Sequence, residues 1–148
     1  MAGIKYRNRR RAVPGLGRAL AARAAAAGGG AATVVTWIPT TPSRRRRRGF
    51  DHGQLLAAEV GRALGVPCRR LLVRAEGPSQ TGRGRRERLE GPHLVPVRSA
   101  SGIVLAVDDV VTTGATATAA ARALRTAGAT EVWVLAAARR DAREPHGA

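Results

Sequence analysis

Two adjacent acids, Asp108 and Asp109, directly follow an apolar run in the stretch VLAVDDVVTTGATATAA. Carboxylates accept hydrogen bonds from sugar hydroxyls and bind hydrated Mg²⁺. The segment after them, Thr112 to Thr116, leads into a predicted helix, whose first N–H groups and positive dipole end suit a phosphate. One loop therefore offers acids for a sugar and a cradle for that sugar's phosphate, which predicts a site for a ribose 5-phosphate.

Each of these residues also has a purely structural interpretation. An Asp after a strand can form a turn, and a Thr at a helix start is often only an N-cap. The ordered combination of apolar strand, Asp-Asp, Thr-Thr-Gly-Ala-Thr and helix favours the functional interpretation. The chain contains neither GxxxxGK[ST] nor GxGxxG, so the common nucleotide-binding loops are poor competitors.

The elements around this motif predict an α/β fold. The β-branched stretch Ala32–Pro39 and the run Gly102–Val107 are typical of strands that are buried on both faces, and Glu131–Ala138 is expected to be a third strand. A helix over Ala115–Ala127 separates the second strand from the third, which predicts a parallel crossover. We therefore expect a parallel sheet with helices on both faces. Ligands bind such sheets beyond the carboxyl ends of the strands, where Asp108 and Asp109 lie.

The remaining elements are less regular. Helices are expected over Val13–Ala27 and Gln54–Leu64, with a short strand in RRLLVRA, whereas Pro39 and Pro42 open a loop. Glu76–Pro92 has no apolar periodicity and is expected to be a mobile loop. The predicted organisation is an N-terminal helical or hood segment (1–31), a core (32–140) and a disordered tail (141–148).

Composition excludes several classes of protein. The 148 residues, 44% of them hydrophobic, suit one compact domain. No apolar run is long enough to span a bilayer, and the N-terminus lacks the apolar centre of a signal peptide, so a cytoplasmic protein without membrane contact is expected. Cys68 is the single cysteine and the histidines are scattered, so neither an internal disulfide nor a structural zinc is expected.

The strong positive charge has two explanations. A net charge of +16 and a pI near 12 suit a nucleic acid or another polyanion as partner. All but one of the 26 basic residues are arginine, however, and a GC-rich genome would impose the same bias on any surface. Aromatic residues make up only 3% of the chain, which leaves little material for stacking single-stranded bases.

VLAVDDVVTTGAT resembles the signature of the type I phosphoribosyltransferases, which bind 5-phosphoribosyl 1-pyrophosphate (PRPP) with Mg²⁺. The family pattern is an apolar strand, two acids and a Thr-Gly-x-Thr phosphate loop. The resemblance implies that Asp108 and Asp109 contact the ribose hydroxyls and the Mg²⁺, as the catalytic and metal-binding pair. It implies that the 5-phosphate is wrapped by Thr112, Thr113, Gly114, Ala115 and Thr116.

More of the chain resembles the ComF branch of this family, bacterial proteins named for competence, the uptake of DNA. The matching pieces are IKYRNRR, VVTWIP, RRRRRGFDHGQLLA and Gln80, so the resemblance covers nearly everything from Lys5 to Arg140. ComF proteins often carry an N-terminal zinc ribbon, and this chain starts at the KYR segment without one, as a short form or from a truncated start. They usually read RGFNQ, where Asp51 and His52 follow Phe50 here.

The resemblance also points to residues for pyrophosphate. By position in the type I fold, the loop at Pro39, Thr40 and Thr41 would bind it, although a rigid turn would use the same residues. Arg48 is the preferred candidate within the run Arg44–Arg48 to neutralise the leaving group, while most such runs are simply solvated. The arginines of the predicted mobile loop, which would close over the site or form a disordered basic loop, are Arg83, Arg85, Arg86 and Arg88.

The leading hypothesis is a PRPP-binding phosphoribosyltransferase that transfers phosphoribose to an unidentified nitrogen acceptor and releases pyrophosphate. The alternative is a non-catalytic accessory protein of DNA uptake that binds DNA or a helicase through its basic surface. A degraded, inactive fragment is the third hypothesis. The acceptor and the oligomeric state stay open, although dimers are common among the relatives.

Overall fold

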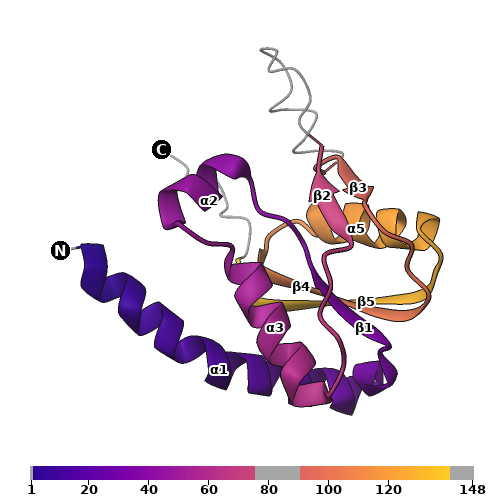
Figure 1. The fold of residues 1–148 in the computed structure, drawn as a ribbon, viewed down its shortest axis with the longest axis horizontal. Helices are drawn as coiled ribbons and strands as arrows, with labels where there is room; N and C mark the ends of the chain where they lie inside the picture. Colours follow the sequence, from indigo (N-terminus) through magenta and orange to yellow (C-terminus); the bar gives the residue numbers. More distant parts are fainter. Residues whose placement is uncertain (1, 76–90, 141–148) are drawn as a thin grey trace, which may run out of the picture.

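The sheet at the centre of the protein is parallel, in the order β1 (Val34–Trp37), β4 (Gly102–Val111), β5 (Ala129–Arg139) (Figure 1). The computed structural model describes residues 2–75 and 91–140, with side chains from residue 10 onward. Strand β4 pairs with β1 on one side and with β5 on the other. The crossover from β4 to β5 runs through helix α5 (Ala115–Thr126), as predicted.

Successive side chains of β4 enter two different cores, because a strand alternates its side chains between the two faces of a sheet. Val104 and Ala106 face a core formed with α5 and with the antiparallel pair β2 (Leu72–Arg74) and β3 (Leu94–Pro96). Leu105 and Val107 face a core formed with helices α1 (Ala2–Ala27) and α3 (His52–Leu64). Figure 1 shows these elements on opposite faces of the sheet, so the predicted α/β fold with helices on both faces is confirmed.

Helix α1 is longer than the predicted Val13–Ala27, since it begins at Ala2 and includes Pro14. The residues before Val13 have no apolar stripe, so hydrophobic periodicity could not predict that they are helical. The helix crosses α3 closely: a Cβ on Gly17 would collide with the Cβ of Glu59. A 3-10 turn, η1 (Gly29–Ala31), then leads to β1.

The loop predicted at Pro39 and Pro42 contains a helix, α2 (Pro42–Arg48). Thr41 caps its N-terminus by accepting a hydrogen bond from the Arg44 N–H at 3.3 Å, and proline is well tolerated at the first helical position. Gly49 ends the helix in the left-handed conformation. The arginines of the last turn lie at the negative end of the helix dipole, which stabilises a helix that looked like a solvated charge run.

Strand β4 does not stop at Val107, where the prediction ended it, but continues to Val111. The acids therefore lie within the strand, and Asp108 is paired in register with Ala136 of β5. The apolar run ended at the first charge, whereas the backbone partners supplied by the long strand β5 continue to Arg139. Strand β1 ends at Trp37, so the acidic part of β4 projects beyond it.

Strand β3 was not predicted, because three residues are too few to display a period. Most of the predicted loop Glu76–Pro92, with Gln80, Arg83, Arg85, Arg86 and Arg88, and the tail 141–148 lie outside the described residues. None of the helices described is both long and apolar enough to cross a membrane.

Candidate functional site

A pocket of about 530 Å³ lies at the carboxyl ends of the strands, where parallel sheets bind their ligands. It brings together eight predicted site residues from three parts of the chain: Pro39, Thr40, Thr41, Arg48, Asp108, Asp109, Thr112 and Thr116. Three further predicted residues, Thr113, Gly114 and Ala115, join Thr112 to Thr116 at the start of α5 without lining the pocket. The predicted residues thus meet at one edge of the sheet, which is a finding about their position and not yet about their roles.

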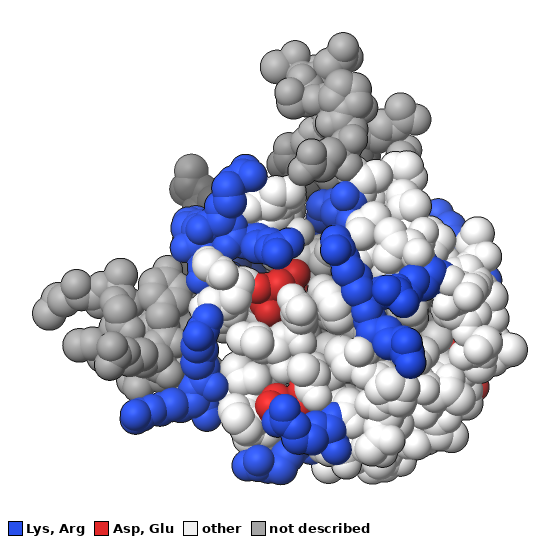
Figure 2. Space-filling model, viewed as in Figure 1, with Lys and Arg blue, Asp and Glu red and all other residues white. Residues whose placement is uncertain are grey.

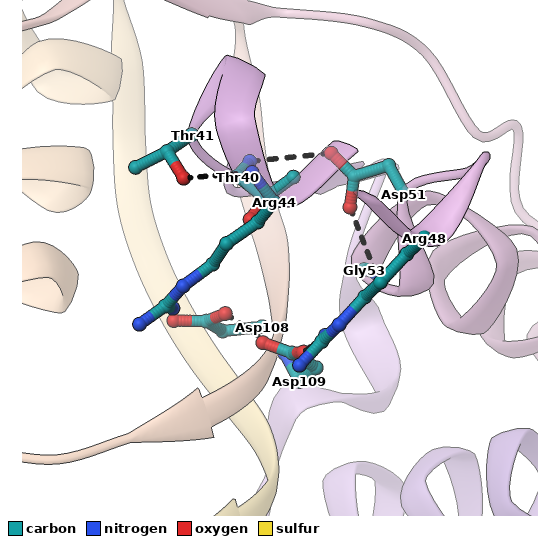
Figure 3. A network of polar contacts seen from close by, with 8 residues as sticks. All are labelled: Thr40, Thr41, Arg44, Arg48, Asp51, Gly53, Asp108 and Asp109. Carbon is teal, nitrogen blue, oxygen red and sulfur yellow. Dashed lines mark hydrogen bonds and ion pairs between the residues drawn. The ribbon is translucent and has the colours of Figure 1, made fainter. Parts of the chain in front are cut away.

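The two acids point to opposite faces of the sheet, because they are neighbours on one strand. Asp108 continues the face of Ala106 and is 9% exposed, and its Oδ1 accepts a hydrogen bond from the Asp109 N–H at 2.8 Å. Asp109 continues the face of Val107 and forms an ion pair with Arg48, whose Nη1 lies 3.0 Å from Oδ2. Figure 3 shows the two carboxylates next to each other, with Arg44 and Arg48 reaching toward them.

Burial raises the pKa of Asp108 to about 7, and the neighbouring Asp109 carboxylate adds to this shift. Hydrogen bonds from the backbone of Asp109 and Val110 act in the opposite direction but are weaker. A carboxyl group held in this way is ready to ionise fully when a cation is placed beside it, since an adjacent positive charge lowers the pKa of an acid.

Asp51 fixes the predicted pyrophosphate loop to helix α3. Its Oδ1 accepts from the Gly53 N–H at 3.0 Å, which caps the helix, and its Oδ2 accepts from the Thr40 N–H at 3.2 Å. Figure 3 shows both contacts. The departure from the family's RGFNQ at this position therefore has a structural role in this chain, because one carboxylate satisfies two backbone donors.

The threonine loop turns into α5 through Gly114, which has φ of 83° in the left-handed region that favours glycine. Nothing lies within 4 Å of the position that a Cβ would take there, so the space above this turn is open. The N-cap residue of α5 is Gly114, which has no side chain that could accept a hydrogen bond from the N–H groups of the first turn. The Thr113 Oγ1 accepts from one of them, the Ala115 N–H, at 3.3 Å. Such a helix start can donate backbone N–H groups to an anion.

Helix α2 turns part of the arginine run toward this pocket. Arg44, Arg47 and Arg48 line it, which is the three- and four-residue spacing of one helix face. Arg48, preferred for an anion, is instead paired with Asp109, whereas Arg44 and Arg47 are exposed. Figure 3 shows Arg44 and Arg48 both extending from α2 toward the acids.

Sequence reasoning missed two of the arginines that line the pocket, Arg74 and Arg140. Each directly ends or follows a strand, Arg74 at the end of β2 and Arg140 after β5. The rule that sites lie at the carboxyl ends of parallel strands could have found Arg140, whereas Arg74 ends a strand of the antiparallel pair, which the rule does not cover. Figure 2 shows the result, a small acidic spot surrounded by basic side chains.

The donor set fits Mg²⁺, which binds to proteins through one or two carboxylates and takes its other oxygens from water or substrate phosphates. Asp108 and Asp109 supply hard carboxylate oxygens at the pocket wall. Within the described residues no group of three or more His, Cys, Asp or Glu side chains could hold a metal by itself. A cation here would therefore take its remaining oxygens from water or from a bound ligand.

No protein-family model matches the chain, and none of the curated proteins matches it. Solved structures do. The glutamine PRPP amidotransferase from B. subtilis, solved with ADP and GMP, is 29% identical over 86% of this chain, with a TM-score of 0.62. A structure described as the allosteric regulatory enzyme of purine biosynthesis is 28% identical over 86% of this chain, with a TM-score of 0.60. The purine phosphoribosyltransferase from Pyrococcus horikoshii Ot3 is 19% identical over 82% of this chain and 69% of its own, with a TM-score of 0.50.

The chain has the type I phosphoribosyltransferase fold. It spans about a quarter (26%) of the amidotransferase chains that it matches, so the activities of those whole proteins are not transferred to it. These matches establish the fold, whereas the narrower resemblance to the ComF branch remains an expectation.

The raised pKa of Asp108 predicts a pH-dependent effect of Asp108→Asn. Between the ordinary pKa of an Asp and about 7, the folded protein holds a proton that the unfolded chain has lost, so the stability of the wild type falls as the pH rises through this range. Above pH 7 the variant should be more stable by about 2–4 kcal/mol, and at about pH 4 the two should be equal. Asn keeps the Oδ1 that accepts from the Asp109 N–H.

Urea unfolding followed by circular dichroism across this pH range measures the effect. Glu131→Gln, at an exposed position on β5, is the matched control and should show no such change with pH. A stability difference for Asp108→Asn that does not change between pH 4 and pH 8 would show that its carboxyl is not destabilised by burial.

Proposed function

We propose that this protein binds PRPP with Mg²⁺ and transfers its phosphoribosyl group to a nitrogen acceptor. The observation that supports this most strongly is the joint position of the acid pair and the open start of α5 in one pocket. A ribose 5-phosphate needs both, because its hydroxyls require acceptors and its phosphate requires donors. The type I phosphoribosyltransferase fold supports the same ligand.

In the proposed complex, the hydroxyls of the ribose donate to Asp108 and Asp109, and the loop Thr112–Thr116 binds the 5-phosphate. Pro39 and Thr40 border the place of the pyrophosphate, with Arg44 and Arg47 as its exposed counterions. Arg48 holds Asp109 and positions it. Bound Mg²⁺ would be held by the two carboxylates and would neutralise charge on the pyrophosphate.

The proposed reaction is a displacement at the anomeric carbon. The lone pair of the acceptor nitrogen forms the new bond as the bond from that carbon to the pyrophosphate oxygen breaks, and the nitrogen then loses a proton. No covalent protein intermediate is needed. The protein contributes position and a cationic environment for the leaving group, which are the effects that this chemistry requires. Membership of the ComF branch is a narrower and separate part of this proposal, and the proposal leaves the acceptor unidentified.

Calorimetric titration with Mg²⁺ and PRPP tests the proposal, because two kinds of site predict opposite changes in the affinity for PRPP when the acids are removed. Asp108→Asn combined with Asp109→Asn removes two negative charges from a pocket rich in arginine, so a merely electrostatic anion site would bind PRPP more tightly. Specific recognition of the ribose predicts the reverse, a loss of about tenfold or more.

The control is Glu59→Gln combined with Glu131→Gln, which makes the same change of charge away from the pocket. Its affinity for PRPP should stay within about twofold of the wild type, since neither glutamate lines the pocket and charges at a distance are screened by salt. Unchanged or tighter binding by the Asp108 and Asp109 double variant would sink the proposal.

DNA binding is a second candidate, favoured by the exposed arginines of α2 and by the net charge of +16. Such binding would depend on phosphates and counterion release, so it predicts a steep fall of affinity with salt. Fluorescence anisotropy of a labelled DNA duplex at several salt concentrations measures it. The Asp108 and Asp109 double variant should bind DNA at least as well as the wild type, and a flat salt response would remove this candidate.

A further inference from the structure

A second, larger pocket lies on the other side of helix α2. Its volume is about 810 Å³, within the range of roughly 300–1,000 Å³ that is typical of small-molecule sites. It is bordered by β1 at Trp37, by the start of α3 at Gln54 and by the segment from Arg70 to Arg74. Like the first pocket, it lies at a carboxyl strand end, here that of β1.

The helical period divides the arginine run between the two pockets. Arg45 and Arg46 line the second pocket together with Pro42 and Gly49, at the spacing of one helix face. Arg44, Arg47 and Arg48 line the first pocket from the opposite face. The five consecutive arginines therefore line two different pockets.

The second pocket differs from the first in its charge. Four arginines line it, and its single carboxylate, Asp51, already accepts from two backbone N–H groups. Within residues 10–75 and 91–140, no ion pair joins Arg45, Arg46 or Arg70 to a carboxylate. The first pocket, by contrast, contains the acid pair in addition to its arginines. The second pocket is thus built for negative charge without a bridging cation.

One wall of the second pocket is apolar. Trp37 is half-buried, and Val73 and Pro42 also line the pocket. A pocket lined by an indole and by arginines is suited to a ligand that combines phosphates with a flat or apolar part. The shared wall of the two pockets consists of Pro39, Thr40, Asp51 and Arg74, which keeps the two ligand positions adjacent.

We propose that this pocket binds a multiply phosphorylated small molecule at a site separate from the acid pair. The proposal does not depend on the proposed function, because neither Asp108 nor Asp109 contributes to this pocket. Two sources of this chemistry, an inorganic polyphosphate and a nucleoside polyphosphate, are distinguished by the experiment.

Trp37 provides a reporter within the site. The chain has two tryptophans, and Trp133→Phe leaves Trp37 as the only one. Its fluorescence is followed during titration with inorganic tripolyphosphate and, separately, with ATP, without Mg²⁺ and at about 0.1 M salt, where distant charges are screened. Both probes should change the emission of Trp37. ATP binding clearly tighter than tripolyphosphate would assign the apolar wall to a base, and equal binding would assign the site to phosphates alone.

Arg45→Ala combined with Arg46→Ala should weaken tripolyphosphate binding by about tenfold or more, because each arginine supplies charge-assisted hydrogen bonds. Arg18→Ala combined with Arg23→Ala, two exposed positions on α1, removes the same charge and should change the affinity less than about twofold. Calorimetry on the protein with both tryptophans repeats the measurement should Trp133→Phe fold poorly.

Three outcomes would overturn the proposal. Neither probe binds; or the α1 variant loses as much affinity as the α2 variant, which would make the effect one of total charge; or an excess of PRPP displaces tripolyphosphate completely, which would make the two pockets a single site. The last outcome would leave the proposed function intact, and a failure of PRPP to bind would leave this proposal intact.

Discussion

Strand β4 has to be buried on both faces and still end in two carboxylates, and the rest of the structure depends on this constraint. Four successive residues, Val104 to Val107, are completely buried. They fix the register of β4 between β1 and β5, and the register fixes where the acids emerge. Because side chains alternate, one acid must enter each face, where Asp108 stays buried and Asp109 meets Arg48. The divergence of the pair thus follows from the strand itself.

The buried acid has a cost for stability that is best understood through ligand binding. A carboxyl group whose pKa is raised to about 7 lowers the stability of the folded protein as the pH rises from the ordinary pKa of an Asp to about 7, because the unfolded chain gives up the proton more readily. Natural proteins keep such residues mainly at functional sites, where strain or desolvation is relieved by a bound partner. Asp51 also accepts from two backbone N–H groups, those of Thr40 and Gly53, and these two contacts join the loop after β1 to helix α3. Asp51 thus organises the loop, whereas in our proposal Asp108 accepts from the ribose of the bound ligand.

Much of this arrangement follows from local patterns in the chain. The apolar runs of β1, β4 and β5 predicted the parallel sheet, and the acid pair with its threonine loop predicted which residues meet at its edge. What local patterns missed depends on partners distant in sequence. The extension of β4 past Val107 requires the backbone of β5, and the three residues of β3 are a strand only because β2 pairs with them. Helix α2 was missed because a run of arginines has no apolar period, although its caps at Thr41 and Gly49 were visible.

The central claim is that the acid pair and the start of α5 bind the two ends of one phosphoribosyl group. A crystal structure of the protein with Mg²⁺ and PRPP tests this most directly. We expect the ribose hydroxyls within hydrogen-bond distance of Asp108 and Asp109, and the 5-phosphate at the backbone N–H groups that follow Gly114. A complex in which the phosphates lie among Arg45, Arg46 and Arg70 while the acid pair contacts no sugar would contradict the account.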